Sequence, residues 1–284
     1  FPNSQKGERN FIIRGAGDSA AKINNGASRW VNIMGYSMQP SELLKPFLIV
    51  ILAFLISSTN KIKIKTYELD GKVLAFFLLT LTSFILIKQP NYSMVTILFF
   101  VLLSQLFIAG ISLKLTFTII FTIITFSIFS YFSLAHVKKR VLDYVFSEKP
   151  NYQVEKSIQA FSSGGLLGNG PGDGKIKKHI PDAHTDFIFP VIAEEYGVIV
   201  CISIIFIIFT IFFRGLHRAS KIKDLFSLLT CSGLLVLFIA QALTNISVSL
   251  KLIPTTGVTL PLISYGGSSL LSMGIVMGIM LALT

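Results

Sequence analysis

The stretch HIPDAHTDFIFPVIAEEYGVIV, residues 179–200, decides the fold, because a polar turn passes there into a long apolar run. The run continues to about residue 213, long enough to cross the ~30 Å hydrocarbon core of a bilayer as a helix. Four acids lie at its entrance or inside it: Asp182, Asp186, Glu194 and Glu195. Because charge is costly in lipid, such acids by default indicate a functional cavity or a paired group.

The composition extends this reading to the whole chain. Of 284 residues, 52% are hydrophobic and only 14% are charged, and the mean hydropathy is +0.70. Soluble domains carry about a quarter charged residues. We expect an all-α polytopic membrane protein with seven visible spans, roughly 42–58, 73–88, 92–109, 113–134, 187–213, 225–249 and 264–283.

Charge predicts the orientation of these spans. Two short connections, 59–72 and 214–224, are dense in Lys and Arg, which favours the cytoplasmic side. The long loop at about 135–186 is then outside, although it is also basic. The net charge of +11 lies in loops between spans, so it favours anionic lipid head groups or a phosphate-bearing substrate over nucleic acid.

Metal and disulfide chemistry find little support in the sequence. Cys201 and Cys231 both lie in apolar runs and are best read as small buried side chains. No cluster of Cys and His has metal-ligand spacing.

The first visible span begins with a candidate ion pair. Glu42 and Lys45 are three residues apart and share one helix face, so they can pair inside the membrane. A structural pair that fixes helix packing is the favoured interpretation.

The acids of the opening stretch allow two interpretations. Asp186, or Thr185 before it, could be the N-cap of the following helix, and for an isolated Asp that is the simpler reading. Glu194 and Glu195 lie ~12 Å further along a straight helix, where a carboxylate must be paired, neutral or facing a wet cavity. One of the two glutamates could line a cavity together with Asp186, but hardly both.

A second unusual stretch is LIPTTGVTLPLISYGGSSLL, residues 252–271. Its prolines and Gly257 break any helix, and irregular backbone at membrane depth must be buried in protein or line a cavity. The small residues 266–269 then open the last helix, which suits either anion binding or close helix packing.

Taken together, these stretches resemble the SEDS family (shape, elongation, division and sporulation), which includes FtsW, RodA and SpoVE. The resemblance covers about residues 26–284, and its details are closer to the division branch, FtsW, than to RodA. It is carried by the segments Arg29–Trp30, QPSELLK at 39–45, Gln89–Pro90, YQVEKS at 152–157, the glycine-rich 164–172, DAHTDFIF at 182–189 and TGVTLPLISYGGSS at 256–269.

The resemblance implies a ten-helix SEDS fold in the bacterial cytoplasmic (inner) membrane, acting in cell division at the septum. The first three helices would be missing here, and residues 1–25 have no clear family counterpart. Asn91 stands where the family usually has Asp, so a charge near the cavity is lost.

The implied activity is that of a peptidoglycan glycosyltransferase that polymerises lipid II, with undecaprenyl pyrophosphate as leaving group, in cell wall biogenesis. Asp186 matches the family's proposed catalytic residue. The implied partners are membrane lipids, a class B penicillin-binding protein (a transpeptidase) and other division proteins. The use of a divalent cation, Mg²⁺ or Mn²⁺, is left open. The expected substrate-binding residues are Arg29, Trp30, Lys175, Lys177, Lys178, His184, Ser264, Gly266, Gly267, Ser268 and Ser269.

Two other functions compete with this one. A lipid II flippase would also need broken helices and buried acids, but it requires access from both leaflets, whereas the polar features here cluster at one surface. A division scaffold with impaired catalysis is the third alternative, favoured by Asn91 and the missing helices.

Overall fold

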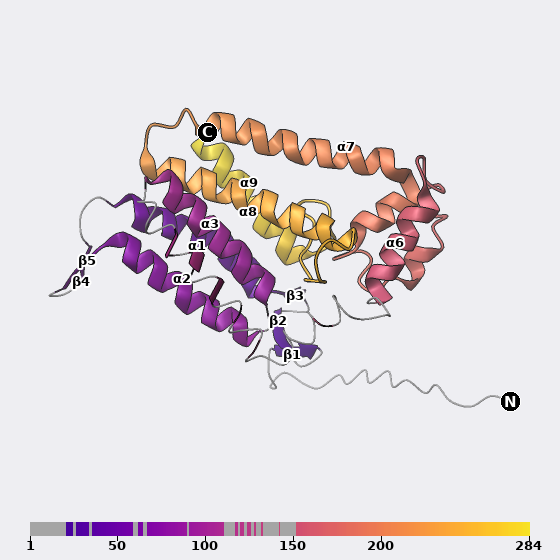
Figure 1. Ribbon diagram of the computed structural model, residues 1–284, viewed down its shortest axis with the longest axis horizontal. Helices are drawn as coiled ribbons and strands as arrows, with labels where there is room; N and C mark the ends of the chain where they lie inside the picture. Colours follow the sequence, from indigo (N-terminus) through magenta and orange to yellow (C-terminus); the bar gives the residue numbers. More distant parts are fainter. Residues whose placement is uncertain are drawn as a thin grey trace.

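The computed structural model describes residues 21–24, 27–33, 36–58, 62–64, 67–89, 91–110 and 152–284, with single positions between 117 and 142. Its helices are α1 (Pro40–Ser57), α2 (Gly71–Lys88), α3 (Tyr92–Ile108), α6 (Tyr152–Gly164), the 3-10 helix η1 (Ile176–His179), α7 (Ile188–Ala219), α8 (Leu225–Ser249) and α9 (Gly267–Leu283) (Figure 1). The strands β1 (Ala21–Asn24), β2 (Ala27–Ile33) and β3 (Tyr36–Met38) form one antiparallel sheet, and β4 (Ile62–Ile64) pairs with β5 (Tyr67–Leu69).

The expected multi-pass helical fold is confirmed. Among the described residues, α1, α2, α7 and α8 are long and apolar enough to cross a membrane. The apolar helices α3 and α9 have 17 residues each, which makes them about 26 Å long. The predicted span 113–134 lies mostly outside the described residues. The short strands were not predicted, and they lie before α1 and in the connection between α1 and α2.

The two ends of the bundle differ in character (Figure 1). The hairpin β4–β5 and the connection from α7 to α8 lie at one end, and α6 lies at the other. The two basic connections that the charge count assigned to one side therefore do share an end.

The two described helices that start at this basic end, α2 and α8, each have an acidic N-cap. Asp70 accepts a hydrogen bond from the backbone N–H of Lys72 (2.9 Å) at the start of α2. Asp224 accepts from the Oγ of Ser227 (2.6 Å) and from its backbone N–H (2.9 Å) at the start of α8. Both bonds lower the pKa of Asp224 below its ordinary value, and the bond from the Ser227 hydroxyl has the larger effect.

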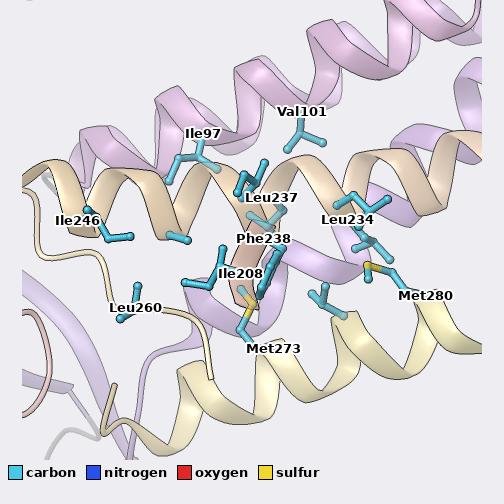
Figure 2. Close-up of a cluster of buried hydrophobic side chains, with 14 of the residues drawn as sticks. Ile97, Val101, Ile208, Leu234, Leu237, Phe238, Ile246, Leu260, Met273 and Met280 are labelled. Carbon is cyan, nitrogen blue, oxygen red and sulfur yellow. The ribbon is translucent and has the colours of Figure 1, made fainter. Parts of the chain in front are cut away.

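The core is built around α8. Figure 2 shows Phe238 of α8 with Ile97 and Val101 of α3 on one side and Met273 and Met280 of α9 on the other, and all five are buried. A second cluster joins α1, α2 and α3. Large apolar side chains elsewhere on α2, α3 and α7 are exposed, as expected of surfaces that face lipid.

The long helix α7 is not the single straight span that the sequence predicted. Gly197 interrupts it with φ 79° and ψ 175°, which separates a first segment, 188–196, from a second, 198–219. A residue with a side chain is strained at this positive φ, whereas glycine is not. Glu194 and Glu195 therefore lie on the short first segment. Because α7 is kinked, the depth predicted for them on a straight helix is not a depth in the membrane.

Candidate active site

Asp186 lies in a compact turn, residues 181–187, directly before α7. The carbonyl of Asp182, which adopts φ 54°, accepts hydrogen bonds from the backbone N–H groups of Asp186 (3.1 Å) and Phe187 (3.3 Å). The N-cap position of α7 falls on Phe187, which makes no side-chain cap bond. Neither Asp186 nor Thr185 therefore occupies the cap, and the cap interpretation is wrong.

Three successive carbonyls of this turn accept hydrogen bonds from other segments. The carbonyl of His184 accepts from the backbone N–H of Tyr265 (2.9 Å), and that of Thr185 from the hydroxyl of Ser264 (2.6 Å). The carbonyl of Asp186 accepts from the side-chain amide of Asn245 (2.8 Å). The irregular segment 250–266 and α8 thus fix the backbone of the turn at three points.

The carboxylate of Asp186 faces the irregular segment at Gly257. A Cβ on Gly257, which has φ +71°, would lie 3.4 Å from Oδ2 of Asp186. Gly257 is exposed and Asp186 is partly exposed, so a polar ligand can approach this carboxylate from solvent. The exposed His184 is two residues away on the same turn.

A buried polar chain joins α1 to the same irregular segment. The predicted pair is formed, with Nζ of Lys45 2.5 Å from Oε2 of Glu42. Lys45 also donates to Oε1 of Gln241 (3.0 Å), and Nε2 of Gln241 donates to the carbonyl (3.2 Å) and hydroxyl (3.1 Å) of Thr259. The ion pair is therefore connected, through one glutamine, to the segment that faces Asp186.

The two glutamates of α7 bind the loop between α6 and α7. Glu194 is fully buried, and its two oxygens accept from the backbone N–H groups of Ile176 (2.7 Å) and Lys177 (2.8 Å) at the start of η1. Glu195 pairs with the ammonium of Lys177. The expectation that one of them lines a cavity with Asp186 is not met, because both carboxylates are engaged by the loop at residues 176–177.

The glycine-rich loop covers the kink of α7. The N–H groups of Asn169 and Gly170 donate to the carbonyls of Glu194 (2.9 Å) and Glu195 (3.0 Å), and Val198 donates to the carbonyl of Gly165 (3.0 Å). These bonds satisfy backbone groups that the kink removes from the helix ladder.

Glycine is required in this contact because two backbones touch. A Cβ on Gly164 would lie 1.9 Å from the carbonyl oxygen of Ala193, and one on Gly168 would lie 2.2 Å from that of Glu195. The glycine-rich loop is therefore a clamp on the kink of α7.

The expected substrate-binding residues lie in different settings. Lys177 is paired with Glu195, and Gly267 is exposed in the first turn of α9. Lys175, Lys178 and His184 are exposed in the loop between α6 and α7 and can reach a ligand. Ser264 is buried, and its hydroxyl is used within the fold, since it donates to Thr185 and accepts from the N–H of Leu260 (2.7 Å). The side chains of Arg29 and Trp30 lie outside the described residues.

The start of α9 is still compatible with both predicted roles, anion binding and close helix packing. Gly266 is its N-cap and makes no side-chain cap bond, while Ser268 and Ser269 are buried. The hydroxyl of Ser269 donates to the carbonyl of Gly266 (3.2 Å). Asn91 is the N-cap residue of α3.

Within the described residues no three His, Cys, Asp or Glu side chains stand together in a way that could hold a metal ion.

Two residues of this site, Gln241 and Asn245, were not predicted from the sequence. Gly257 was predicted only to break a helix, and its position beside Asp186 was not. The signal was available for the first two. Gln241 and Asn245 are amides four residues apart, and therefore on one face, in a span that has no charged residue.

Comparison with known proteins adds the family context. A family model described as "Cell cycle protein", for FtsW, RodA and SpoVE, matches residues 12–284. The chain is 38% identical over 259 residues to a probable peptidoglycan glycosyltransferase FtsW of Caulobacter vibrioides, covering 91% of this chain and 65% of the relative. It is 34% identical over 275 residues to the protein of the same description in Geobacter metallireducens, covering 95% of this chain and 72% of the relative.

Two solved structures share the fold. A chain of a peptidoglycan synthase complex that coordinates polymerization and crosslinking matches with a TM-score of 0.74 at 24% identity, covering 93% of this chain and 75% of that one. The rod shape determining protein RodA of Thermus thermophilus matches with a TM-score of 0.62 at 24% identity, covering 92% and 70%.

Proposed function

The chain belongs to the FtsW, RodA and SpoVE family of cell cycle proteins, and on this premise we propose that it is a peptidoglycan glycosyltransferase of cell division. Its substrate is lipid II, which it polymerises into glycan strands. The similar proteins of Caulobacter and Geobacter carry the description peptidoglycan glycosyltransferase, which supports this assignment. The chain spans 65% of the length of the Caulobacter relative.

The observation that carries the proposal is the carboxylate of Asp186. It stands at a partly exposed position on a turn that is fixed by three carbonyl hydrogen bonds, opposite the exposed Gly257. Chemistry that needs a general base requires a carboxylate in a fixed position that substrate can reach.

In the proposed step, the 4-hydroxyl of an acceptor GlcNAc attacks the anomeric carbon of a donor MurNAc. The new bond joins that carbon to the hydroxyl oxygen, and the bond from carbon to pyrophosphate oxygen breaks. Asp186 accepts the hydroxyl proton, and undecaprenyl pyrophosphate leaves with the bonding electrons. The exposed Lys175 and Lys178 are placed to attract the negative charge of the leaving group.

The position of the polar groups favours this enzyme over a flippase. The segment 250–266 and α6 lie at one end of the bundle (Figure 1). The turn that carries Asp186 is bound to that segment and to the nearby end of α8. Transglycosylation needs one reactive surface at which sugars meet while the lipid tails stay in the bilayer. A flippase needs access to both surfaces.

We further propose a class B penicillin-binding protein as partner and the septal inner membrane as location. This chain shares its fold with a chain of a peptidoglycan synthase complex, and that shared fold supports the proposal of a partner.

The test is reconstitution of the protein in liposomes with its cognate penicillin-binding protein and lipid II. We expect glycan chains on a gel. Lipid II that stays monomeric while it crosses the bilayer would overturn the proposal in favour of the flippase, and monomeric lipid II without crossing would favour the scaffold.

A further inference from the structure

Two buried amides on α8 hold the irregular segment 250–266. Gln241 and Asn245 are each 1% exposed and lie one helical turn apart. Gln241 donates to Thr259, and Nδ2 of Asn245 donates to the carbonyl of Val258 (2.7 Å). Adjacent carbonyls of the segment are thus bound by adjacent turns of one helix.

Asn245 differs from Gln241 because it also binds the turn that carries Asp186. Its Nδ2 donates to the carbonyl of Asp186 (2.8 Å) as well as to that of Val258. Both hydrogens of the amide are then used. One side chain therefore connects the residue before Thr259 with Asp186 itself, and Gly257, which faces the Asp186 carboxylate, is next to Val258.

The amide oxygen of Asn245 does not connect these segments. Oδ1 of Asn245 is buried and accepts no hydrogen bond from any described residue. A buried acceptor without a partner is unfavourable. The favourable contribution of this amide therefore comes from the two hydrogen bonds that its Nδ2 donates.

We propose that Asn245 is a positioning residue for the proposed glycosyl transfer, on which this inference rests. Its two bonds set the position of the Asp186 carboxylate relative to the segment at Gly257, and with it the position in which that carboxylate meets the attacking sugar hydroxyl. The bonds from Ser264 and Tyr265 hold the neighbouring carbonyls without it, so loss of Asn245 shifts the carboxylate but leaves the turn attached.

The chain offers a matched control in Gln105 of α3. Gln105 is fully buried, and its Nε2 also donates to two backbone carbonyls, those of Ile49 (3.1 Å) and Leu229 (3.2 Å). Its Oε1 likewise accepts no hydrogen bond from a described residue. Gln105 thus has the bonding pattern of Asn245 but joins α1, α3 and α8 within the helical core.

The experiment compares Asn245→Leu with Gln105→Met, both nearly isosteric, in the reconstituted polymerase assay. We expect Asn245→Leu to lower kcat by about 10- to 100-fold, because small misplacements of a reacting group have effects of this size. KM should change by less than about twofold, since the lipid II contacts remain. Gln105→Met should reduce thermal stability to a similar extent and leave kcat near the wild-type value.

Three outcomes would overturn the inference: wild-type kcat in Asn245→Leu, an equal fall of kcat in Gln105→Met, or a change confined to KM. Should Asn245→Leu fail to fold, Asn245→Asp takes its place, because it has the same shape and at most one donor hydrogen. A wild-type protein that makes no polymer would instead overturn the proposed function. Polymer from the wild type and equally from the Asn245 variant would overturn only the positioning role.

Discussion

The hydroxyl of Ser272 in α9 donates a hydrogen bond of 2.7 Å to the backbone carbonyl of Glu42 in α1. Pro46 lies four residues after Glu42 in the same helix and has no N–H to offer this carbonyl. A side chain from another helix thus satisfies the backbone group that the proline leaves free, as is required in lipid.

Ser272→Ala should therefore destabilise the protein by about 1 kcal/mol, since it leaves a buried carbonyl without a donor. In a Pro46→Ala background the helix can supply its own N–H, and the same serine change should cost clearly less. Thermal unfolding of the four proteins in detergent measures this coupling. Strictly additive effects of the two changes would contradict the account of the Ser272 bond.

The buried ion pair gives a second prediction. Lys45→Met leaves the carboxylate of Glu42 and Oε1 of Gln241 without their donor, and removal of one partner from such a pair costs about 3–5 kcal/mol. The double change Glu42→Gln and Lys45→Met removes both charges and should be more stable than Lys45→Met alone. Unfolding in detergent decides this, and a double variant as unstable as the single one would argue against a paired charge.

The carboxylate of Glu194 gives a third prediction, because it caps η1. Glu194→Gln replaces one acceptor oxygen by a donor that faces an N–H group, which should weaken the loop by about 1.5–3 kcal/mol. Amide hydrogen exchange at Ile176 and Lys177 should become faster. Glu195→Gln removes only a partly exposed pairing with Lys177 and serves as the control, with a smaller change expected. Equal exchange in both variants would rule out the cap.

The clamp on the α7 kink is tested by two alanine substitutions at similar backbone angles. Gly168 (φ +82°) and Gly172 (φ +88°) are both strained by a side chain, but only at Gly168 would the Cβ meet another backbone, 2.2 Å from the carbonyl oxygen of Glu195. Gly168→Ala should lower the Tm much more than Gly172→Ala. Similar Tm values for the two variants would show that the loop does not rest on α7.

The sequence predicted two spans closely, because a helix in lipid is predominantly apolar along its length. The predicted 225–249 coincides with α8, and 73–88 differs from α2 by two residues at its start. The amphipathic helix α6 was missed because it buries only one narrow face, including Val154 and Ala160, within a polar loop.

The parts of the site that were missed depend on contacts between distant segments. The kink at Gly197 is stabilised by backbone groups of residues 165–170, and no local pattern reveals that pairing. Asp186 was identified through its motif, but its support by Asn245, 59 positions away, required the fold. The catalytic and substrate-binding assignments stay predictions.

The central claim is that the Asp186 carboxylate carries the polymerisation of lipid II. The most direct measurement is the rate of glycan chain growth by Asp186→Asn, which keeps the shape of the side chain and removes its basicity. Asp173→Asn, a change of an exposed acid in the loop between α6 and α7, is the control, and both proteins should unfold at the wild-type temperature. We predict that Asp186→Asn slows chain growth by a factor on the order of 100 or more, while Asp173→Asn polymerises normally. Chain growth at the wild-type rate in folded Asp186→Asn would contradict the account.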